Sequence, residues 1–218
     1  MPQLFRPYAD SVARIVLVAI VVVPFLAIGV AYLIMRSEYI TDQTITLNQP
    51  VPFSHVHHVG DLGLDCRYCH TGVETSPVAG VPPTHVCMTC HSQLYTQTAM
   101  LAPVRESIAE DRPIRWNKVN KLPDYVYFDH SIHIAKGVGC STCHGTVDQM
   151  PLMRQAAPLT MGWCLNCHRD PTPYLRPQSA VFDPDWKPPA DQAAQGRKLL
   201  VKYLIDNHHL TDCSVCHR

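Results

Sequence analysis

The chain has 218 residues with 18 basic and 18 acidic side chains, so its formal net charge is zero. This balance provides no polybasic field, and we expect no nucleic-acid partner. The chain also holds 10 Cys, 13 His and 19 Pro against only 5 Phe and 3 Trp. Few large aromatic residues and many prolines make a poor hydrophobic core, so we expect something other than side chains to fill the interior.

The N-terminal part contains an uncharged apolar run, Ile15–Met35, that is 21 residues long and is bounded by an arginine at each end. A helix needs about 20 such residues to cross the hydrocarbon layer, and transmembrane helices tolerate an internal proline such as Pro24. A cleaved signal peptide has a shorter apolar region of about 7–15 residues, and a buried core helix is disfavoured by the length and position. We therefore expect a transmembrane anchor over residues 12–36.

The ten cysteines fall into five C-x-x-C-H motifs, the attachment signature of c-type haem. Two thiols three positions apart form thioethers with the two vinyl groups of one porphyrin, and the next histidine lies under the iron as its proximal ligand. The expected cofactors are therefore five covalently bound haem c groups. The predicted attachment residues are Cys66, Cys69, Cys87, Cys90, Cys140, Cys143, Cys164, Cys167, Cys213 and Cys216, and the predicted proximal ligands are His70, His91, His144, His168 and His217.

Other uses of paired cysteines fit the pattern less well. Structural zinc sites use CxxC pairs, but zinc gives no reason for a histidine directly after each second cysteine. A thioredoxin-like protein needs one reactive pair and not five. A disulfide across a two-residue gap closes too short a loop to stabilise a fold.

The haem motifs also predict orientation and fold class. Haem is attached to c-type cytochromes outside the cytoplasm, so we expect residues 1–11 to face the cytoplasm and residues 37–218 to lie on the periplasmic or extracellular side of a bacterial cytoplasmic membrane. Five large, flat, apolar porphyrins would form most of the core. The expected fold is a mainly α and irregular multihaem cytochrome c domain with little regular secondary structure, plus one N-terminal transmembrane helix.

An internal repeat selects candidate distal ligands. Residues 53–58 read FSHVHH and residues 128–133 read FDHSIH, and each stretch precedes two haem motifs by a similar distance. The chain therefore reads as a duplicated unit, residues 53–91 and 128–168, with a fifth haem added in residues 190–218. Histidines at i and i+3 share one face of a helical turn and can reach two different irons. The predicted distal ligands are His55, His58, His130 and His133; His57 and His85 have no counterpart in the repeat and are not predicted to bind iron.

The distal ligand of the fifth haem is open at this stage. His208 and His209 are too close to Cys213 to reach the far face of their own haem easily. Methionines are the alternative, and we favour Met150 over Met153 and Met161. A thioether ligand would raise the potential of that haem above those of its bis-histidine neighbours.

Few regular elements are expected elsewhere. A short strand is expected at Thr44–Leu47, a short helix at Met100–Ala109 and an amphipathic helix at Ala190–Asn207. The Pro-rich segment Pro171–Pro189 is expected to wrap the surface in extended form.

Three phrases carry a resemblance over residues 12–218: FSHVHHVGDLGLDCRYCHTGVETSPVAGVPPTHVCMTCH, LPDYVYFDHSIHIAKGVGCSTCHG and PLTMGWCLNCHR. With one anchor and five haems, the chain resembles the pentahaem cytochrome c subunits of alternative complex III, a bacterial quinol:electron-acceptor oxidoreductase. The resemblance implies a larger membrane complex with polytopic quinol-binding subunits, an iron–sulfur subunit and a monohaem cytochrome c. It implies an electron-transfer subunit, not itself an enzyme, that passes electrons from quinol oxidation to a soluble periplasmic acceptor.

Two other functions are weighed against this one. A self-standing one-helix quinol dehydrogenase that feeds periplasmic reductases usually carries four haems, and the duplicated F-x-H-x-x-H element argues against it. A multihaem reductase needs an open coordination position on one iron, whereas every motif here ends in histidine and most irons can be given a sixth ligand.

Overall fold

A computed structural model describes residues 6–217 of the chain. They divide into an N-terminal unit within Met1–Asp42 and a second unit within Gln43–Arg218. The N-terminal unit holds helix α1, Ala9–Met35, and the short helix α2, Glu38–Thr41. The first five residues of the expected cytoplasmic N-terminus lie outside the described residues.

Helix α1 is long and apolar enough to span a membrane. Its 27 residues extend about 40 Å at 1.5 Å per residue, against a hydrocarbon layer of about 30 Å. None of its residues is buried in the unit, so its apolar side chains need a cover other than this chain. The helix begins before the apolar run because Asp10 and Arg14 form an i,i+4 ion pair of 2.9 Å in its first turns.

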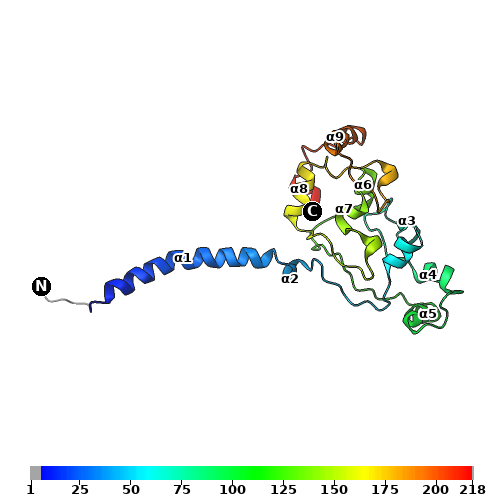
Figure 1. Cartoon of the computed structure of the whole chain (residues 1–218), viewed down its shortest axis with the longest axis horizontal. Helices are drawn as coiled ribbons and strands as arrows, with labels where there is room; N and C mark the ends of the chain where they lie inside the picture. The colour runs from blue at the N-terminus through cyan, green and yellow to red at the C-terminus, as the bar shows by residue number, and fades with distance from the viewer. Residues whose placement is uncertain (1–5, 218) are drawn as a thin grey trace. The chain divides into compact units, whose positions relative to one another are not determined.

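The second unit consists of short helices joined by irregular segments (Figure 1). Its α-helices are α3 Cys66–Cys69, α4 Thr84–His91, α5 Ala102–Ala109, α6 His130–Ala135, α7 Cys140–His144, α8 Met161–Arg169, α9 Gln192–Lys202 and α10 Cys213–Cys216. A π-helix spans Val56–Asp61, and single 3-10 turns span Ala99–Leu101, Val147–Gln149 and Gln178–Ala180. This is the mostly helical and irregular multihaem cytochrome architecture that the sequence predicts.

Two expected elements differ in the structure. Thr44–Leu47 forms only isolated bridges, and no β-strand occurs between residues 6 and 217. Thr44 has φ of 65°, which interrupts an extended backbone. The C-terminal helix is limited to α9 because Leu204, just beyond it, also adopts positive φ. The expected helix at Met100–Ala109 is present as a 3-10 turn followed by α5.

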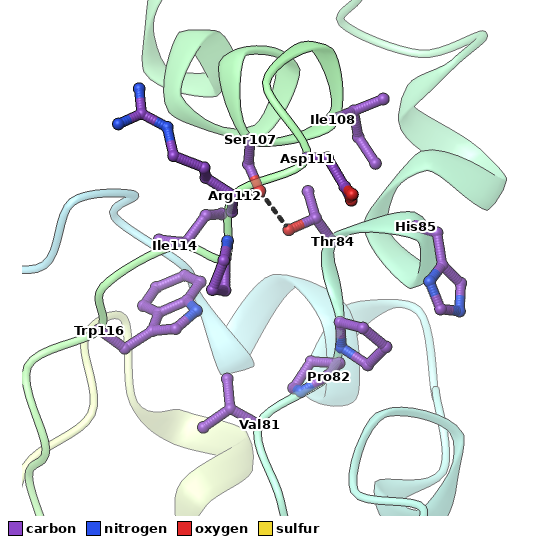
Figure 2. Close-up of a pocket in the computed structure, with 12 residues that line it drawn as sticks. Val81, Pro82, Thr84, His85, Ser107, Ile108, Asp111, Arg112, Ile114 and Trp116 are labelled. Carbon is purple, nitrogen blue, oxygen red and sulfur yellow. Dashed lines mark hydrogen bonds between the residues drawn. The ribbon is translucent and has the colours of Figure 1, made fainter.

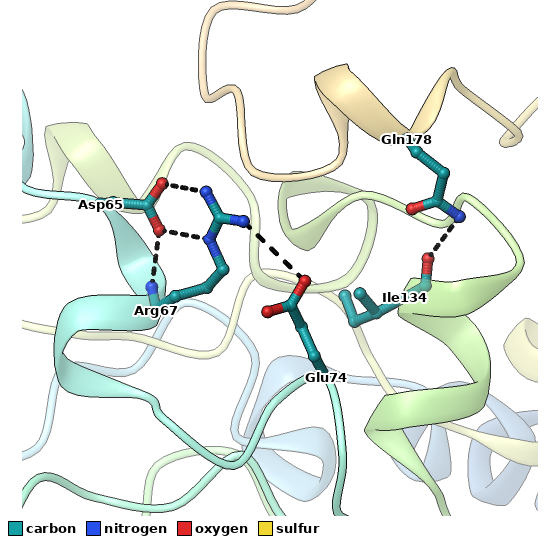
Figure 3. Close-up of polar contacts among 5 residues, drawn as sticks. All are labelled: Asp65, Arg67, Glu74, Ile134 and Gln178. Carbon is teal, nitrogen blue, oxygen red and sulfur yellow. Dashed lines mark hydrogen bonds and ion pairs between the residues drawn. The ribbon is translucent and has the colours of Figure 1, made fainter.

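The prediction that the Pro-rich segment Pro171–Pro189 wraps the surface is also wrong, because part of the segment is buried inside the second unit. Leu175 and Val181 are each 1 % exposed. The backbone at Leu175 pairs with Val138, and the Arg176 amide donates to the Gly137 carbonyl at 2.9 Å. The Gln178 side chain donates to the Ile134 carbonyl at 3.2 Å (Figure 3). The segment therefore closes the domain over α6 and the loop before α7.

Apolar side chains contribute a small core. Ten apolar residues are buried among those described, and the largest fully buried side chains are Met150, Leu175 and Val181. One cluster of buried residues is formed by Val73, Ile134 and Val181. A unit of this size held only by side chains would bury many more large apolar residues. The interior therefore has the composition expected of a domain built around large prosthetic groups.

Helix α9 packs closely on the backbone of Thr172 at Gly196, and a substitution at this glycine can test that contact. A Cβ at Gly196 would collide with the Thr172 backbone carbonyl, whereas a Cβ at Gly162 in α8 would meet nothing within 4 Å. Alanine favours a helix over glycine by about 1 kcal/mol, but overpacking costs about 1–3 kcal/mol. We expect Gly196→Ala to lower, and Gly162→Ala to keep or raise, the thermal midpoint of the haem-loaded protein measured by far-ultraviolet circular dichroism. Equal midpoints for the two variants would contradict the close approach.

Candidate haem sites

Each of the five C-x-x-C-H motifs lies on a short helix. Helices α3, α7 and α10 consist almost entirely of the motif, and α4 and α8 end with it. One helical turn brings residues i and i+3 to the same face, so both thiols of a motif face the same side. The motif helices are started locally: Asp65 caps α3 by accepting from the Arg67 amide at 2.8 Å, and Thr160 caps α8. The geometry that thioether attachment needs is therefore produced by local sequence.

The cysteines are unpaired thiols, and several are unreactive as nucleophiles. All ten are free of disulfides. Burial raises the pKa of Cys143 to about 12 and that of Cys167 to about 11, with a further contribution from neighbouring cysteines. A redox-active CxxC pair shows the opposite shift, because its chemistry needs a thiolate. Cys143 and Cys167 lack that shift, whereas the interaction with Cys140 lowers the pKa of Cys66 to about 7.

Three pairs of histidines oppose each other at one characteristic separation. An imidazole nitrogen binds a metal ion at about 2.0–2.1 Å, so imidazoles on opposite sides of one ion have centroids roughly 6 Å apart. The centroids are 6.3 Å apart for the pair His130 and His144, whose rings are parallel within 3°. The corresponding separations are 6.2 Å for His58 with His91 and 6.1 Å for His133 with His168; in each pair one member belongs to a motif and the other to the repeat.

His55, the repeat histidine outside these three pairs, interacts electrostatically with His70, the histidine of the first motif. Burial, followed by the charge of His70, lowers the pKa of His55 to about 4. Burial likewise lowers the pKa of His144 to about 4. Both imidazoles are therefore neutral at pH 7, the form in which histidine binds a metal. The second, third and fourth motifs thus have a donor geometry that fits a haem iron between two imidazoles, and His55 is the candidate partner of His70 at the first.

Backbone carbonyls set the tautomer of most candidate ligands. A carbonyl can only accept, so an Nδ1 facing one must carry the proton and leave Nε2 bare for a metal. Nδ1 of His70 faces the Gly80 carbonyl at 2.6 Å, and Nδ1 of His133 faces the Asp129 carbonyl at 2.6 Å. The same arrangement, with separations of 2.8–3.2 Å, occurs at His58, His91, His130, His168 and His217.

His57 has different surroundings from these residues. Its Nδ1 faces the Asp61 carboxylate at 3.4 Å, and its side chain is exposed. The Nδ1 of His209 faces Asp212 in a similar way at 3.2 Å. His85 lines a surface hollow of about 410 Å³ together with Val81 and Trp116 (Figure 2). None of these three histidines lies about 6 Å from a motif histidine as the three pairs do among the described residues; the one imidazole contact of His57 is with its neighbour His58, edge-on at 5.5 Å.

The two F-x-H-x-x-H copies have the same internal geometry. Phe53 stacks on His58 at 4.3 Å and 26°, and Phe128 stacks on His133 at 4.5 Å and 26°. Each phenylalanine also meets the first histidine of its copy edge-on, at 4.9 Å for His55 and 4.8 Å for His130. This equivalence holds although one copy continues as a π-helix and the other as helix α6.

The first motif contacts the second and the third. The Tyr68 hydroxyl lies 2.8 Å from Oγ1 of Thr89 in the second motif. The thiols of Cys66 and Cys140 lie close enough for each to be the largest cause of the other's pKa shift, so the first motif lies beside the third. Within the first motif, Arg67 is held by both carboxylate oxygens of Asp65 and lies 3.8 Å from Glu74 (Figure 3).

The fourth motif lies between the third and the fifth. After burial, the charge of Cys167 is the next cause of the raised pKa of Cys143. The charge of Cys216 acts in the same way on the pKa of Cys164. His168 also faces the Leu210 carbonyl just before the fifth motif. The five motifs are therefore neighbours in the order second, first, third, fourth, fifth, which differs from their order in the sequence.

Met150 lies among the first and third sites and is 1 % exposed. Its carbonyl accepts from the amides of His55 and Val56 at 3.2 and 3.3 Å, and its Cε packs 3.5 Å from where a Cβ on Gly145 would be. His217, by contrast, contacts Tyr125, with ring centroids 5.8 Å apart. The fold thus buries Met150 next to the backbone of His55, and its role as a haem ligand stays a prediction.

Comparison with known proteins gives the class of the chain. Residues 126–218 match the family model for cytochrome c7 and related cytochrome c. A stretch of 97 residues is 36 % identical to the multihaem cytochrome c subunit of a menaquinone reductase from Nitratidesulfovibrio vulgaris (strain Hildenborough). That stretch spans 44 % of this chain and 45 % of the relative. The chain is a multihaem cytochrome c with an electron-transfer role, and its C-terminal part is similar to cytochrome c7.

Three features of the site were not predicted from the sequence. They are the order of the motifs in space, the carbonyl partner of each imidazole, and the burial of Arg176 beside the third motif. The lone arginine in a Pro-rich segment gave no signal, because its contacts with the third motif, Ser141 and Thr142, are with residues more than thirty positions away.

The histidine pairs predict different effects of two substitutions. His130→Ala should leave His144 as the lone axial imidazole of the third haem, whereas His57→Ala removes an exposed side chain paired with Asp61. We expect a high-spin ferric signal from one haem in five, measured by electron paramagnetic resonance, only in the first variant. A high-spin signal in both variants, or in neither, would contradict the pairing.

Substitutions of Met150 separate ligation from packing. If Met150 only packs, Met150→Leu should cost less than about 1.5 kcal/mol of stability, and Met150→Ala should cost about 2–5 kcal/mol. The near-infrared band of thioether-bound ferric haem should be unaffected by Met150→Leu. Loss of such a band in this variant would identify Met150 as the ligand predicted from the sequence.

Proposed function

We propose that this chain carries five covalent haem c groups and conducts electrons within a membrane-bound quinone-linked oxidoreductase complex. The ten cysteines of the motifs would hold the porphyrins through thioethers. The motif histidines, with His55, His58, His130 and His133, would hold the first four irons between paired imidazoles. The haem supplies one-electron chemistry, and the chain orients the imidazoles, fixes their tautomer and excludes water.

The opposed imidazole pairs, 6.1–6.3 Å between centroids, carry this proposal. An iron with two axial imidazoles has no vacant position for a substrate, and its ligands need not move when one electron is gained or lost. Such sites suit transfer and not turnover. Neighbouring motifs in a continuous order would let electrons pass from the second haem through the first, third and fourth to the fifth.

Quinone chemistry is assigned to partner subunits. It moves protons with electrons, so it needs a quinone-sized pocket with a titratable group near the membrane. Between Ile15 and Met35 the side chains include no ionisable group except Tyr32, and a single helix cannot enclose a pocket. We propose polytopic quinol-binding subunits, an iron–sulfur subunit and a monohaem cytochrome c as partners, as in alternative complex III. The haem domain would face the periplasm and deliver electrons to a soluble acceptor.

The opposite direction of flow is the second candidate. The relative from Nitratidesulfovibrio vulgaris is named for reduction of menaquinone. A row of haems conducts both ways, and the potentials of the partners at its two ends decide the direction. In that case electrons would enter from a periplasmic donor and reach a quinone in the membrane.

The proposal predicts the mass and the activity of the isolated subunit. Its intact mass should equal that of the chain plus five haem groups, and dithionite should reduce all five. The subunit alone should show negligible oxidation of a quinol analogue, while the intact complex turns over with either the quinol or the quinone. A mass with fewer haems would remove the five-haem proposal, and quinol oxidation by the lone subunit near the rate of the complex would favour a self-standing dehydrogenase.

A further inference from the structure

Arg176 is a buried cation within the haem domain. Its residue is 3 % exposed, although arginine is among the residue types that are least often buried. The backbone is held in place on both sides: its amide donates to the Gly137 carbonyl at 2.9 Å, and its carbonyl accepts from the Tyr203 hydroxyl at 3.1 Å. The side chain therefore has a defined position, and it points into the domain.

The guanidinium lies directly against the third haem motif. Nη2 donates to Oγ of Ser141 at 2.9 Å and approaches Oγ1 of Thr142 at 3.4 Å, the two residues between Cys140 and Cys143. A Cβ on Gly139, the residue before the motif, would collide with the guanidinium. A side chain at this position would therefore displace the guanidinium from its present place against the motif.

The charge of Arg176 is poorly neutralised by the protein. Nη1 donates only to the backbone carbonyls of Ala180 and Asp183. Cζ of the guanidinium lies over the Trp186 ring, 4.3 Å from its centroid. Nε is buried without a partner among the described residues. No carboxylate in that part of the chain forms an ion pair with Arg176; the exposed Asp183 carboxylate acts on it only from a distance.

Arg67 provides the contrast within the same domain. Arg67 lies within the first haem motif, whereas Arg176 approaches the third motif from another segment. The Arg67 side chain is about half exposed and pairs with Asp65 at 2.7 Å and Glu74 at 3.8 Å (Figure 3). Water and two carboxylates screen that charge. Arg176 has neither, so its field acts on the neighbouring group in a medium of low effective dielectric constant.

A second feature of the third site, the surroundings of His144, also favours the reduced state of a bound iron. Nδ1 of His144, the motif histidine, is buried without a hydrogen-bond acceptor among residues 6–217, unlike Nδ1 of His70, His91, His168 and His217. A hydrogen bond from Nδ1 makes an imidazole a more basic ligand, which favours the ferric state. Its absence leaves the third iron with one weaker donor, as the unpartnered Nδ1 of His55 would at the first iron, so Arg176 is what distinguishes the third site from the first.

We propose that Arg176 raises the reduction potential of the third haem, so that this haem is the highest in potential of the four bis-histidine sites. The proposal rests on the proposed haem attachment at Cys140 and Cys143. Reduction adds one electron, supplied by an adjoining reduced haem, and converts ferric to ferrous iron with no bond made or broken. A fixed positive charge stabilises the reduced form, because the site becomes more negative by one charge. Electrons would then collect at the middle of the haem row.

The test is a redox titration of the full-length, haem-loaded protein followed by electron paramagnetic resonance. The third haem is identified as the one whose low-spin signal disappears in His130→Ala. Arg176→Gln should shift the midpoint potential of this haem downward and leave the others near their wild-type values. Arg176→Lys, which keeps the charge, should shift it much less, and Arg67→Gln should leave it unchanged.

Ser141→Asp keeps the test decisive if Arg176→Gln does not fold. It places a carboxylate against the guanidinium and neutralises the charge without removing the arginine, so the same downward shift is expected. An unchanged midpoint potential of the third haem in a folded five-haem Arg176→Gln or Ser141→Asp protein overturns the role of Arg176. A wild-type protein that lacks haem at the third motif would instead remove the proposed haem assignment.

Discussion

Opposing imidazoles in the haem domain lie 6.1–6.3 Å apart, which is the separation that one intervening metal ion imposes on two nitrogen ligands. Much of the domain can be understood as the means of holding that separation. One-turn helices carry the motif histidines, and the F-x-H-x-x-H copies bring a second histidine to each of two neighbouring motifs. Carbonyl acceptors then orient the rings, while Phe53 and Phe128 pack on them at nearly identical angles.

The duplicated halves meet through their first motifs, Cys66 against Cys140, and not through the end of one and the start of the next. This arrangement places the first and third sites at the centre and the second and fourth on either side. The two imidazoles without a carbonyl partner, His55 and His144, belong to these two central sites. The centre of the row is thus chemically different from its ends, although the local sequences of the repeats are alike, and the buried charge of Arg176 adds to this difference.

The small apolar core has a consequence for stability. Ten buried apolar residues cannot by themselves offset the conformational entropy of a domain with so few hydrogen-bonded elements. The structure depends instead on the fit between short helices, the buried segment around Leu175 and the prosthetic groups proposed to lie between them. Close contacts such as Gly139 with Arg176 and Gly196 with Thr172 show how little space the chain leaves between its own segments.

Local patterns in the sequence predicted the long apolar N-terminal helix, the helical and irregular fold, and the histidines that meet. Each of these depends on neighbours within a few residues: an uninterrupted apolar run, the i,i+3 spacing of thiols, and the same spacing of imidazoles. The sequence alone did not predict the order of the motifs, the burial of the Pro-rich segment or the burial of Arg176 beside the third motif. Those features depend on contacts such as Arg176 with Ser141 and Cys66 with Cys140, between residues far apart in the chain, and only the tertiary structure decides which distant segments pack together.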